Sequence, residues 1–442
     1  MRPLPLLVIG LGVATGAYGQ TEDQDADQGE GAVAESSGEE LTARQEYERQ
    51  EAEAAKKGSA GFFQRSADNV TSQLNADRLR IDGLFDLGPI SRLGEEFRAF
   101  NEDLRFTTRL DLGLAYTVLW QHASAGEPHR TAASGDFDFF GTWHAVGELG
   151  RTAGLVGFAV EYRHDFGGIT PSDLHTQFGS LLNTARSFND TAAGLKEIWW
   201  QQHLANGQFY MRIGAIDQSD FFSTNRFQSA NFFFLNEVFA ESLAVPFPDA
   251  GLGVVAFGFP NESVYIGAGI GDASPSRGSV ASDSLSGEIF AALEVGLLTA
   301  FEGLGAGHYR LTVSHTDAIP QRNQPSGQSL AISIDQELGR FVPFTRLAFS
   351  EKEGLTSFRR IVTAGFGLED PFDNAGDEFG MAAAWAQPSD PQLSDEWVVE
   401  SFYRLQLSPT MQFTPDVQFI INPSSGTKDV VVVFGLRLRI QY

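Results

Sequence analysis

Charged side chains recur two or four residues apart in segments where polar and apolar residues alternate. Successive side chains of a strand point to opposite faces, so residues at this spacing share one face. The residues that this pattern places on polar faces are Arg109, Asp111, Glu161, Arg163, Arg212, Glu294, Arg310, Asp335, Arg346, Glu400, Arg404, Arg437 and Arg439. A wall with charges of both signs creates a transverse field and offers many hydrogen-bonding groups to a small polar molecule. The same charges could instead only solvate and brace a wet interior.

The sequence contains no comparable pattern of residues for catalysis. The chain contains no cysteine, no Gly-x-Ser-x-Gly elbow, no phosphate-binding loop and no His-Glu-x-x-His motif, so we expect no enzyme. The histidines lack paired ligand spacing, and we therefore expect neither a metal nor a cofactor. A formal net charge of -26 argues against nucleic acid as a partner, because a phosphate backbone needs a basic surface.

The alternation itself predicts strands. In residues 110–120, Leu, Tyr, Val and Trp side chains occupy one face, and in residues 430–442 the apolar face ends at Tyr442. Such segments run for about ten residues or more, which is the length that crosses a bilayer when tilted, whereas strands of soluble proteins usually have about five or six. The 47 glycines, the 37 phenylalanines and the mean hydropathy of -0.15 fit strands with one oily and one wet face.

Counting these segments gives sixteen, from 105–120 to 429–442. Long connections such as 167–194 and 218–248 alternate with short ones such as Asn206-Gly207, as expected when long loops leave one end of a barrel and tight turns the other. The fold class predicted is all-β: a transmembrane antiparallel β-barrel of about 16 strands, with a short N-terminal helical or disordered periplasmic extension. The two longest loops either fold into the lumen or pack on the rim or a neighbouring copy, and the sequence leaves both open.

The sequence divides the chain into three successive parts. Arg2, the apolar run 4–14 and Ala17-Tyr18-Gly19 predict a signal peptide over residues 1–19. Residues 20–104 are an acidic spacer followed by a short helical segment, and residues 105–442 are the outer-membrane barrel. We therefore expect export to the cell outer membrane of a Gram-negative bacterium.

The last segments resemble a known family. Glu400 to Thr410 form a strand with Glu and Arg inward before a Pro turn, and Thr414-Pro415-Asp416-Val417-Gln418, Ile421-Asn422-Pro423 and Gly435-Leu436-Arg437 follow in order. This succession is similar to the end of the OprB family of carbohydrate-selective porins, most clearly over 395–442. The family's paired glycines and Trp before the first strand are replaced here by Arg80-Ile81-Asp82-Gly83-Leu84.

The resemblance implies a passive diffusion channel for carbohydrates and other small hydrophilic solutes, with outer-membrane lipid around it. Porins of this size usually form trimers, so it also allows a homotrimer. We expect the pore-lining and constriction residues to be Arg109, Asp111, Glu161, Arg163, Arg212, Glu400, Arg404, Arg437 and Arg439, the first four because alternation places them mid-strand. The alternatives are a non-conducting structural or adhesive barrel and a barrel enzyme that acts on lipid.

Overall fold

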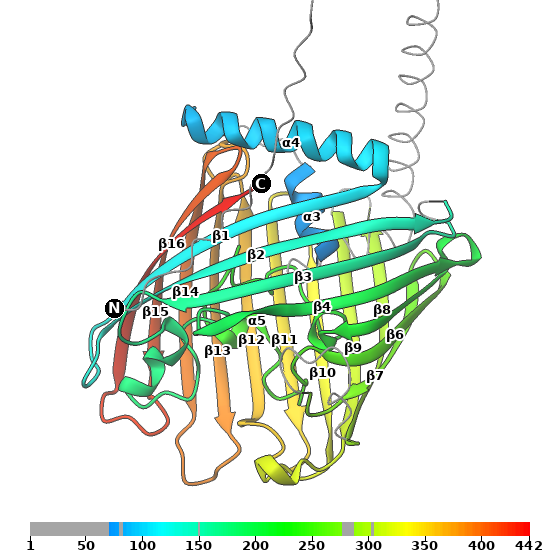
Figure 1. The fold of residues 1–442 in the computed structure, drawn as a ribbon. Coiled ribbons are helices and arrows are strands. Elements are labelled where there is room, and N and C mark those ends of the chain that lie inside the picture. Colours follow the sequence, from blue (N-terminus) through cyan, green and yellow to red (C-terminus); the bar gives the residue numbers. More distant parts are fainter. Residues whose placement is uncertain (1–69, 79–82, 149–150, 276–286, 302–304) are drawn as a thin grey trace, which may run out of the picture. The chain divides into compact units, whose positions relative to one another are not determined.

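Strands close into one antiparallel barrel in the computed structural model (Figure 1), which describes residues 70–78, 83–148, 151–275, 287–301 and 305–442. Within these residues there are sixteen strands, each paired with its neighbours in sequence, and β16 pairs with β1. They are β1 (Leu110–Ala123), β2 (Thr131–Val146), β3 (Gly154–Asp165), β4 (Thr191–Leu204), β5 (Phe209–Ile216), β6 (Gly251–Asn261), β7 (Val264–Asp272), β8 (Ile289–Phe301), β9 (Gly305–Thr316), β10 (Gly327–Gln336), β11 (Phe341–Ser350), β12 (Phe358–Glu369), β13 (Glu378–Pro388), β14 (Glu396–Ser408), β15 (Met411–Ile421) and β16 (Val430–Gln441). The predicted fold class and strand number are confirmed.

Helices are few among the described residues. They are α3 (Val70–Arg78), α4 (Pro89–Thr108), α5 (Glu237–Ala240) and four short 3-10 helices, η1 (Pro171–Gln177), η2 (Ala205–Gly207), η3 (Gln218–Asp220) and η4 (Pro320–Arg322). No helix in the described part of the chain has the length and apolar content to cross a membrane. The predicted signal peptide and most of the acidic spacer lie outside the described residues.

The connections between strands alternate in length around the barrel. Two residues link β14 to β15, whereas residues 166–190 link β3 to β4 and residues 217–250 link β5 to β6. One end of the barrel therefore carries the long loops and the other the tight turns. The helix α4 lies at the tight-turn end (Figure 1), where the Asn101 side chain donates to the Leu112 carbonyl of β1.

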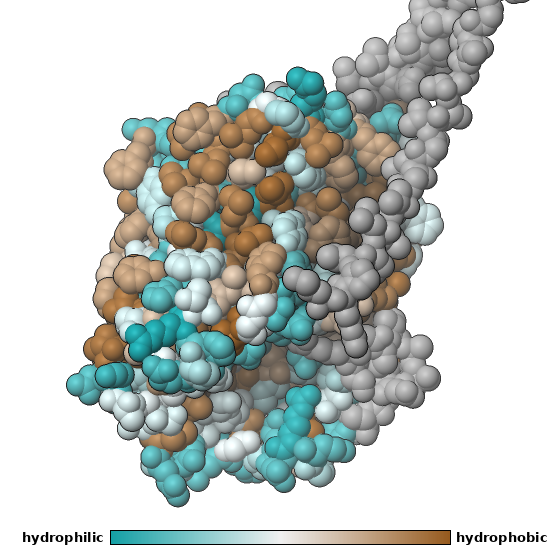
Figure 2. All heavy atoms as spheres, turned by 60° about the vertical axis from the view of Figure 1, so that its left-hand side comes forward, coloured by the Kyte–Doolittle hydropathy of each residue, from teal (hydrophilic) through white to brown (hydrophobic). Residues whose placement is uncertain are grey.

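The outer wall is apolar. Large hydrophobic side chains that are exposed include Trp120, Ile266, Leu293, Val313, Met381, Phe419 and Leu436, all at outward positions of strands. Figure 2 shows apolar residues gathered over the wall and hydrophilic residues toward the long-loop end. This distribution is the one that a hydrocarbon environment requires of a barrel.

Strand boundaries differ from the sequence prediction by a few residues, most informatively at the start of the first strand. The first strand was expected to begin at residue 105, but residues 105–108 complete α4 and β1 begins at Leu110. Arg109 ends the helix in the left-handed conformation, with φ of 61°, and its N–H donates to the Arg105 carbonyl. Polar and apolar residues alternate both at the end of the helix and in the strand. The alternation therefore predicted a start of the strand that is too early.

A charge on the lipid face tests the membrane assignment. Leu293 lies mid-strand on β8 and is 47 % exposed, whereas Leu338 lies in a tight turn and is 40 % exposed. We expect Leu293→Arg to lower the free energy of unfolding by about 2–4 kcal/mol, because an arginine at the bilayer midplane is costly, and Leu338→Arg to lower it by about 0–1 kcal/mol. Urea titration of the barrel folded in vesicles measures both, and equal losses would contradict the depth assignment.

Candidate functional site

The strand register assigns every side chain of the barrel to one face. Paired residues on neighbouring strands point to the same side, and Thr117 pairs with Asp136 on β2 and with Arg439 on β16. All three are buried, as are most residues on this face, while the residues between them are exposed or partly exposed. The inner face therefore carries the polar and charged side chains, and these form the candidate site.

Two of the predicted constriction residues do not lie mid-strand. Arg109 is exposed at the end of α4 and lies outside the barrel wall, because the helix continues to Thr108. Asp111 faces inward but is the second residue of β1, at the tight-turn end, where its carboxylate accepts a hydrogen bond from Asn101 Nδ2 at 2.9 Å. The prediction that this pair stands in the middle of the pore is wrong.

Glu161 and Arg163 lie on the inner face of β3, and the structure brings them together. Arg163 Nη2 donates to Glu161 Oε2 at 2.5 Å, and Arg163 Nε lies 3.3 Å from Asp136 Oδ1 of β2. Lys196 Nζ of β4 lies 3.6 Å from the same oxygen of Glu161. Together with Asp138, these residues form what we call the β2–β4 charge cluster.

Arg212 occupies a different environment. Its guanidinium lies 3.6 Å from the centroid of the Trp199 ring and 5.0 Å from that of Phe221, and Nη2 donates to Gln201 Oε1 at 2.8 Å. The residue is 1 % exposed. Arg212 is therefore enclosed between aromatic rings, one from β4 and one from the loop 217–250, and it joins that loop to the wall.

The Phe-rich loop 217–250 folds into the barrel. Its rings pack on one another and on inward rings of the wall, with centroid distances of 5.0 Å from Phe227 to Phe344 and 4.9 Å from Phe234 to Phe402. Glycines on the inner face make room for the loop: a Cβ at Gly269 would lie 2.5 Å from the Phe222 ring. Of the two placements left open by the sequence, the structure shows the inward one.

The predicted residues Glu400, Arg404 and Arg437 bind the backbone of this loop. Glu400 accepts the amide N–H groups of Leu235 and Asn236 at 2.5 and 3.0 Å. Arg437 donates to the Ala230 and Phe233 carbonyls, and Arg404 lies 3.4 Å from the Phe232 carbonyl. The backbone N–H and C=O groups of a loop buried inside a barrel cannot form hydrogen bonds with water. These charged residues are their hydrogen-bond partners instead.

Arg346 also binds backbone carbonyl groups of this loop. It faces inward but is not among the predicted constriction residues. Its Nη2 lies 3.0, 3.1 and 2.6 Å from the carbonyl oxygens of Val238, Phe239 and Glu241. These three carbonyls belong to the short helix α5 and the residue after it. A cation beside the carbonyl end of a helix is stabilising, and here it holds α5 against the wall of β11.

Arg439 holds a segment from the N-terminal side of the chain. It donates to Thr117 Oγ1 at 2.8 Å and to Gln73 Oε1 of α3 at 3.2 Å. Val70 and Leu74 of α3 are buried, with 2 % and 3 % exposure. The helix α3 therefore packs against inward residues of the wall, a placement for which the sequence carried no signal.

The second long loop, 166–190, is also bound inside. Glu396 of β14 accepts from Leu181 N at 2.8 Å and from Ser180 Oγ at 2.7 Å. The two loops meet where Arg186 Nη1 lies 2.6 Å from Glu241 Oε2, and where the Glu237 amide donates to the Asn183 carbonyl at 3.1 Å. Because each loop is hydrogen-bonded to both the wall and the other loop, the two loops form one connected structure inside the barrel.

Open space remains at the long-loop end and along part of the described barrel wall. A cavity of about 520 Å³ at the long-loop end is lined by Leu181, Glu353, Gly354, Ser357, Ser389, Asp390, Pro391 and Leu393. On the wall of the barrel, Asp138, Ala159 and Lys196 are partly exposed. The inner faces of β13 to β16, by contrast, are almost wholly buried under the loops. In the described part of the wall, Asp138 and Lys196 thus leave the β2–β4 charge cluster partly accessible, while its other three residues are buried.

A sixteen-stranded barrel whose loops narrow a polar lumen is the architecture of porins. Residues 294–442 match the family model described as carbohydrate-selective porin, OprB family, which confirms the resemblance predicted from residues 395–442. The high-pH structure of Pseudomonas putida OprB superposes with a TM-score of 0.67 at 13 % identity, covering 78 % of this chain and 97 % of that chain. Its low-pH structure gives 0.50 at 12 % identity with the same coverage. No curated protein matches the sequence.

The family match and the fold together support an outer-membrane porin and imply the outer membrane of a Gram-negative bacterium. The matched family model describes porins, which are channel proteins. The structural likeness, at 13 % identity, concerns the fold alone.

Removing the Glu400 carboxylate tests whether it fixes the loop 217–250. We expect Glu400→Ala to free the Leu235 and Asn236 amides, at about 1.5–3 kcal/mol for each lost bond to a charged group. Limited chymotrypsin digestion should then cut this loop faster than in the wild type. Glu353→Ala is the matched control, because Glu353 is exposed and pairs with Arg359 at the surface. Equal resistance of Glu400→Ala and wild type would refute the anchoring role.

A second test follows from the pKa of Glu237, which burial and then the neighbouring Glu241 carboxylate raise to about 7. A carboxyl group with a raised pKa in the folded state contributes stability below its ordinary value of about 4.3, and this contribution is lost as the pH rises through the folded value. The contact between the two loops should therefore weaken from pH 5 to pH 8.

Hydrogen-exchange protection factors of the Glu237 and Arg186 amides report that contact, since both donate across it. We expect protection to fall with rising pH in the wild type and to fall less in Glu237→Gln, with barrel amides as the internal reference. A pH dependence of the same size in both proteins would show that Glu237 does not cause it.

Proposed function

We propose that this protein is a passive channel through which carbohydrates and other small hydrophilic solutes diffuse across the outer membrane. The observation that carries the proposal is the β2–β4 charge cluster: acids and bases of both signs lie together on the inner wall, and two of them, Asp138 and Lys196, keep partial exposure. The family match over residues 294–442 supports carbohydrates as the solute class. No bond is made or broken in this function.

Passage would depend on weak, exchangeable contacts. Glu161, Arg163 and Lys196 offer donors and acceptors that can exchange with sugar hydroxyls, while their mutual ion pairs leave no strong net field to trap a neutral molecule. A solute held tightly could not leave, so selectivity has to come from many weak contacts in a narrow space. The constriction residues that we propose are therefore those of the cluster, without Arg109.

The sidedness of the channel follows the usual arrangement of such barrels. The tight turns and α4 would face the periplasm, and the long loops with the open cavity of about 520 Å³ would face the outside. The hydroxyl and carboxylate groups of Ser357, Ser389 and Asp390 in that cavity would then meet incoming solutes first. The apolar outer wall would contact outer-membrane lipid.

A non-conducting barrel is the second candidate, and a specific observation favours it. Two loops and α3 all bind inward residues, so much of the lumen is filled. Liposome swelling separates the two functions. The full chain in vesicles should admit neutral sugars at rates that fall with sugar size, and no swelling with any solute would overturn the channel.

Arg163→Ala tests the position of the constriction. Removing this guanidinium leaves Asp136 without its ion-pair partner and Glu161 with Lys196 alone, so we expect single-channel conductance to rise, selectivity to shift toward cations and block by sugars to change. Arg359→Ala is the control, since Arg359 pairs with Glu353 at the surface of the long-loop end. Conductance and sugar block equal to those of the control would remove Arg163 from the constriction.

A further inference from the structure

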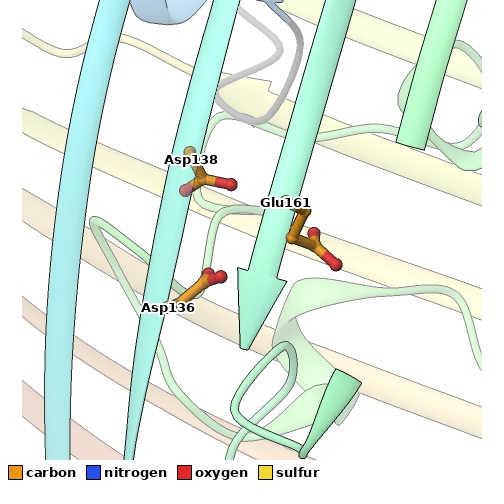
Figure 3. A group of neighbouring side chains, drawn as sticks. All are labelled: Asp136, Asp138 and Glu161. Carbon is orange, nitrogen blue, oxygen red and sulfur yellow. The ribbon is translucent and has the colours of Figure 1, made fainter. Parts of the chain in front are cut away.

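Three carboxylates converge on the inner face of the barrel (Figure 3): Asp136 and Asp138 of β2 and Glu161 of β3. We propose that they bind a divalent cation, and that this cation is calcium. The inference goes beyond the proposed function, because the binding of an ion can be measured whether or not the barrel conducts.

The register of β2 and β3 brings the three groups together. Asp136 and Asp138 are two residues apart and share the inner face of β2, and Glu161 lies directly opposite Asp138 on β3. One carboxylate oxygen from each residue lies within 4.8 Å of the others. In an oxygen-coordinated calcium site with bonds of about 2.3–2.6 Å, ligands on opposite sides are about 4.6–5.2 Å apart, so three oxygens at this spacing can share one ion.

Independent support comes from oxygens that lack a partner. Within the described residues, Asp136 Oδ2 and Asp138 Oδ2 are buried and receive no hydrogen bond, and Asp136 is only 1 % exposed. A buried carboxylate oxygen without a donor is costly, and native structures usually satisfy such atoms with protein groups, water or an ion. These free oxygens belong to two of the three converging residues.

The basic residues of the wall bind one oxygen each of Asp136 and Glu161. Arg163 binds Asp136 through Oδ1 and Glu161 through Oε2, and Lys196 also approaches Glu161 Oε2. No described residue makes a hydrogen bond or an ion pair with the Asp138 carboxylate. Arg439, Lys196 and Arg163 act on Asp138 through their charge alone, so its oxygens stay available to an ion. Arg163 fixes the orientation of the other two carboxylates without using the Asp136 Oδ2 atom.

The chemistry of the donors selects the ion. Carboxylate oxygens are hard ligands, and the described part of the site supplies no imidazole or thiolate, which disfavours zinc and copper. Calcium accepts six to eight oxygens in irregular arrangements and can complete its shell with water from the lumen, whereas magnesium needs a near-ideal octahedron at about 2.0–2.1 Å. The nearby guanidinium of Arg163 weakens binding, so we expect a dissociation constant on the order of 0.1–1 mM, as in extracellular calcium modules.

Equilibrium dialysis of the full-length barrel in detergent tests the proposal. Protein stripped with EDTA is titrated with radiolabelled calcium chloride, and the wild type is compared with Asp138→Asn and with Asp165→Asn. Asp165 is an exposed acid at the end of the same β3, so its substitution changes the net charge equally without touching the three residues. Calcium that binds to acidic residues elsewhere in the chain is common to all three proteins.

We expect Asp138→Asn to lose one bound calcium per chain, or to bind it at least tenfold more weakly, while Asp165→Asn matches the wild type. Equal binding by wild type and Asp138→Asn would overturn the site, and an equal loss in Asp165→Asn would reduce it to general attraction by charge. Magnesium competing as well as calcium would overturn the choice of ion. If Asp138→Asn does not form the barrel, Glu161→Gln takes its place, with unchanged calcium binding again overturning the proposal.

Discussion

Backbone hydrogen bonding around a closed ring of strands is the constraint on which the rest of this structure depends. In hydrocarbon, each unpaired N–H or C=O group costs several kcal/mol, so a sheet that spans a membrane cannot keep a free edge. The ring closes between β1 and β16, from Ala115 opposite Gln441 to Ala123 opposite Val433. Leu114 and Tyr442 exchange two further bonds of 2.7 Å, so the ladder reaches the last residue of the chain.

The same constraint applies again inside the barrel, and there it determines what the charged residues do. A loop that enters the lumen brings backbone groups that have to find partners. Glu400, Arg437 and Arg346 supply them, each with two or three contacts to the loop 217–250. Inward charge therefore has two roles in this molecule. Glu294 of β8 and charged residues of β11 to β16 bind the loop backbone, whereas those of β2 to β4 pair mainly with one another, although Arg163 also donates to Asn189 of the loop 166–190.

The features that follow from local periodicity could be predicted from the sequence. Strand number, the inward face of β3 and the alternation of long and short connections all depend on residues close together in the chain. The end of α4 could not be placed, because one left-handed residue, Arg109, separates two segments that alternate alike. Contacts between residues far apart were also out of reach: Glu400 meets Leu235 across 165 positions, and no spacing records that.

The uneven division of the inner wall has a consequence for how the barrel could select solutes. Residues bonded to loop backbone cannot reorient toward a passing molecule without leaving buried groups unpaired, which makes the β11–β16 side rigid. In the β2–β4 charge cluster, by contrast, Glu161 is shared between Arg163 and Lys196, and such shared bonds can exchange for a solute hydroxyl at little net cost. Asp138, opposite Glu161, adds a carboxylate that forms no hydrogen bond or ion pair with a described residue. In the proposed channel, the rigid side would fix the width of the lumen, and the exchangeable side would supply the contacts to the solute.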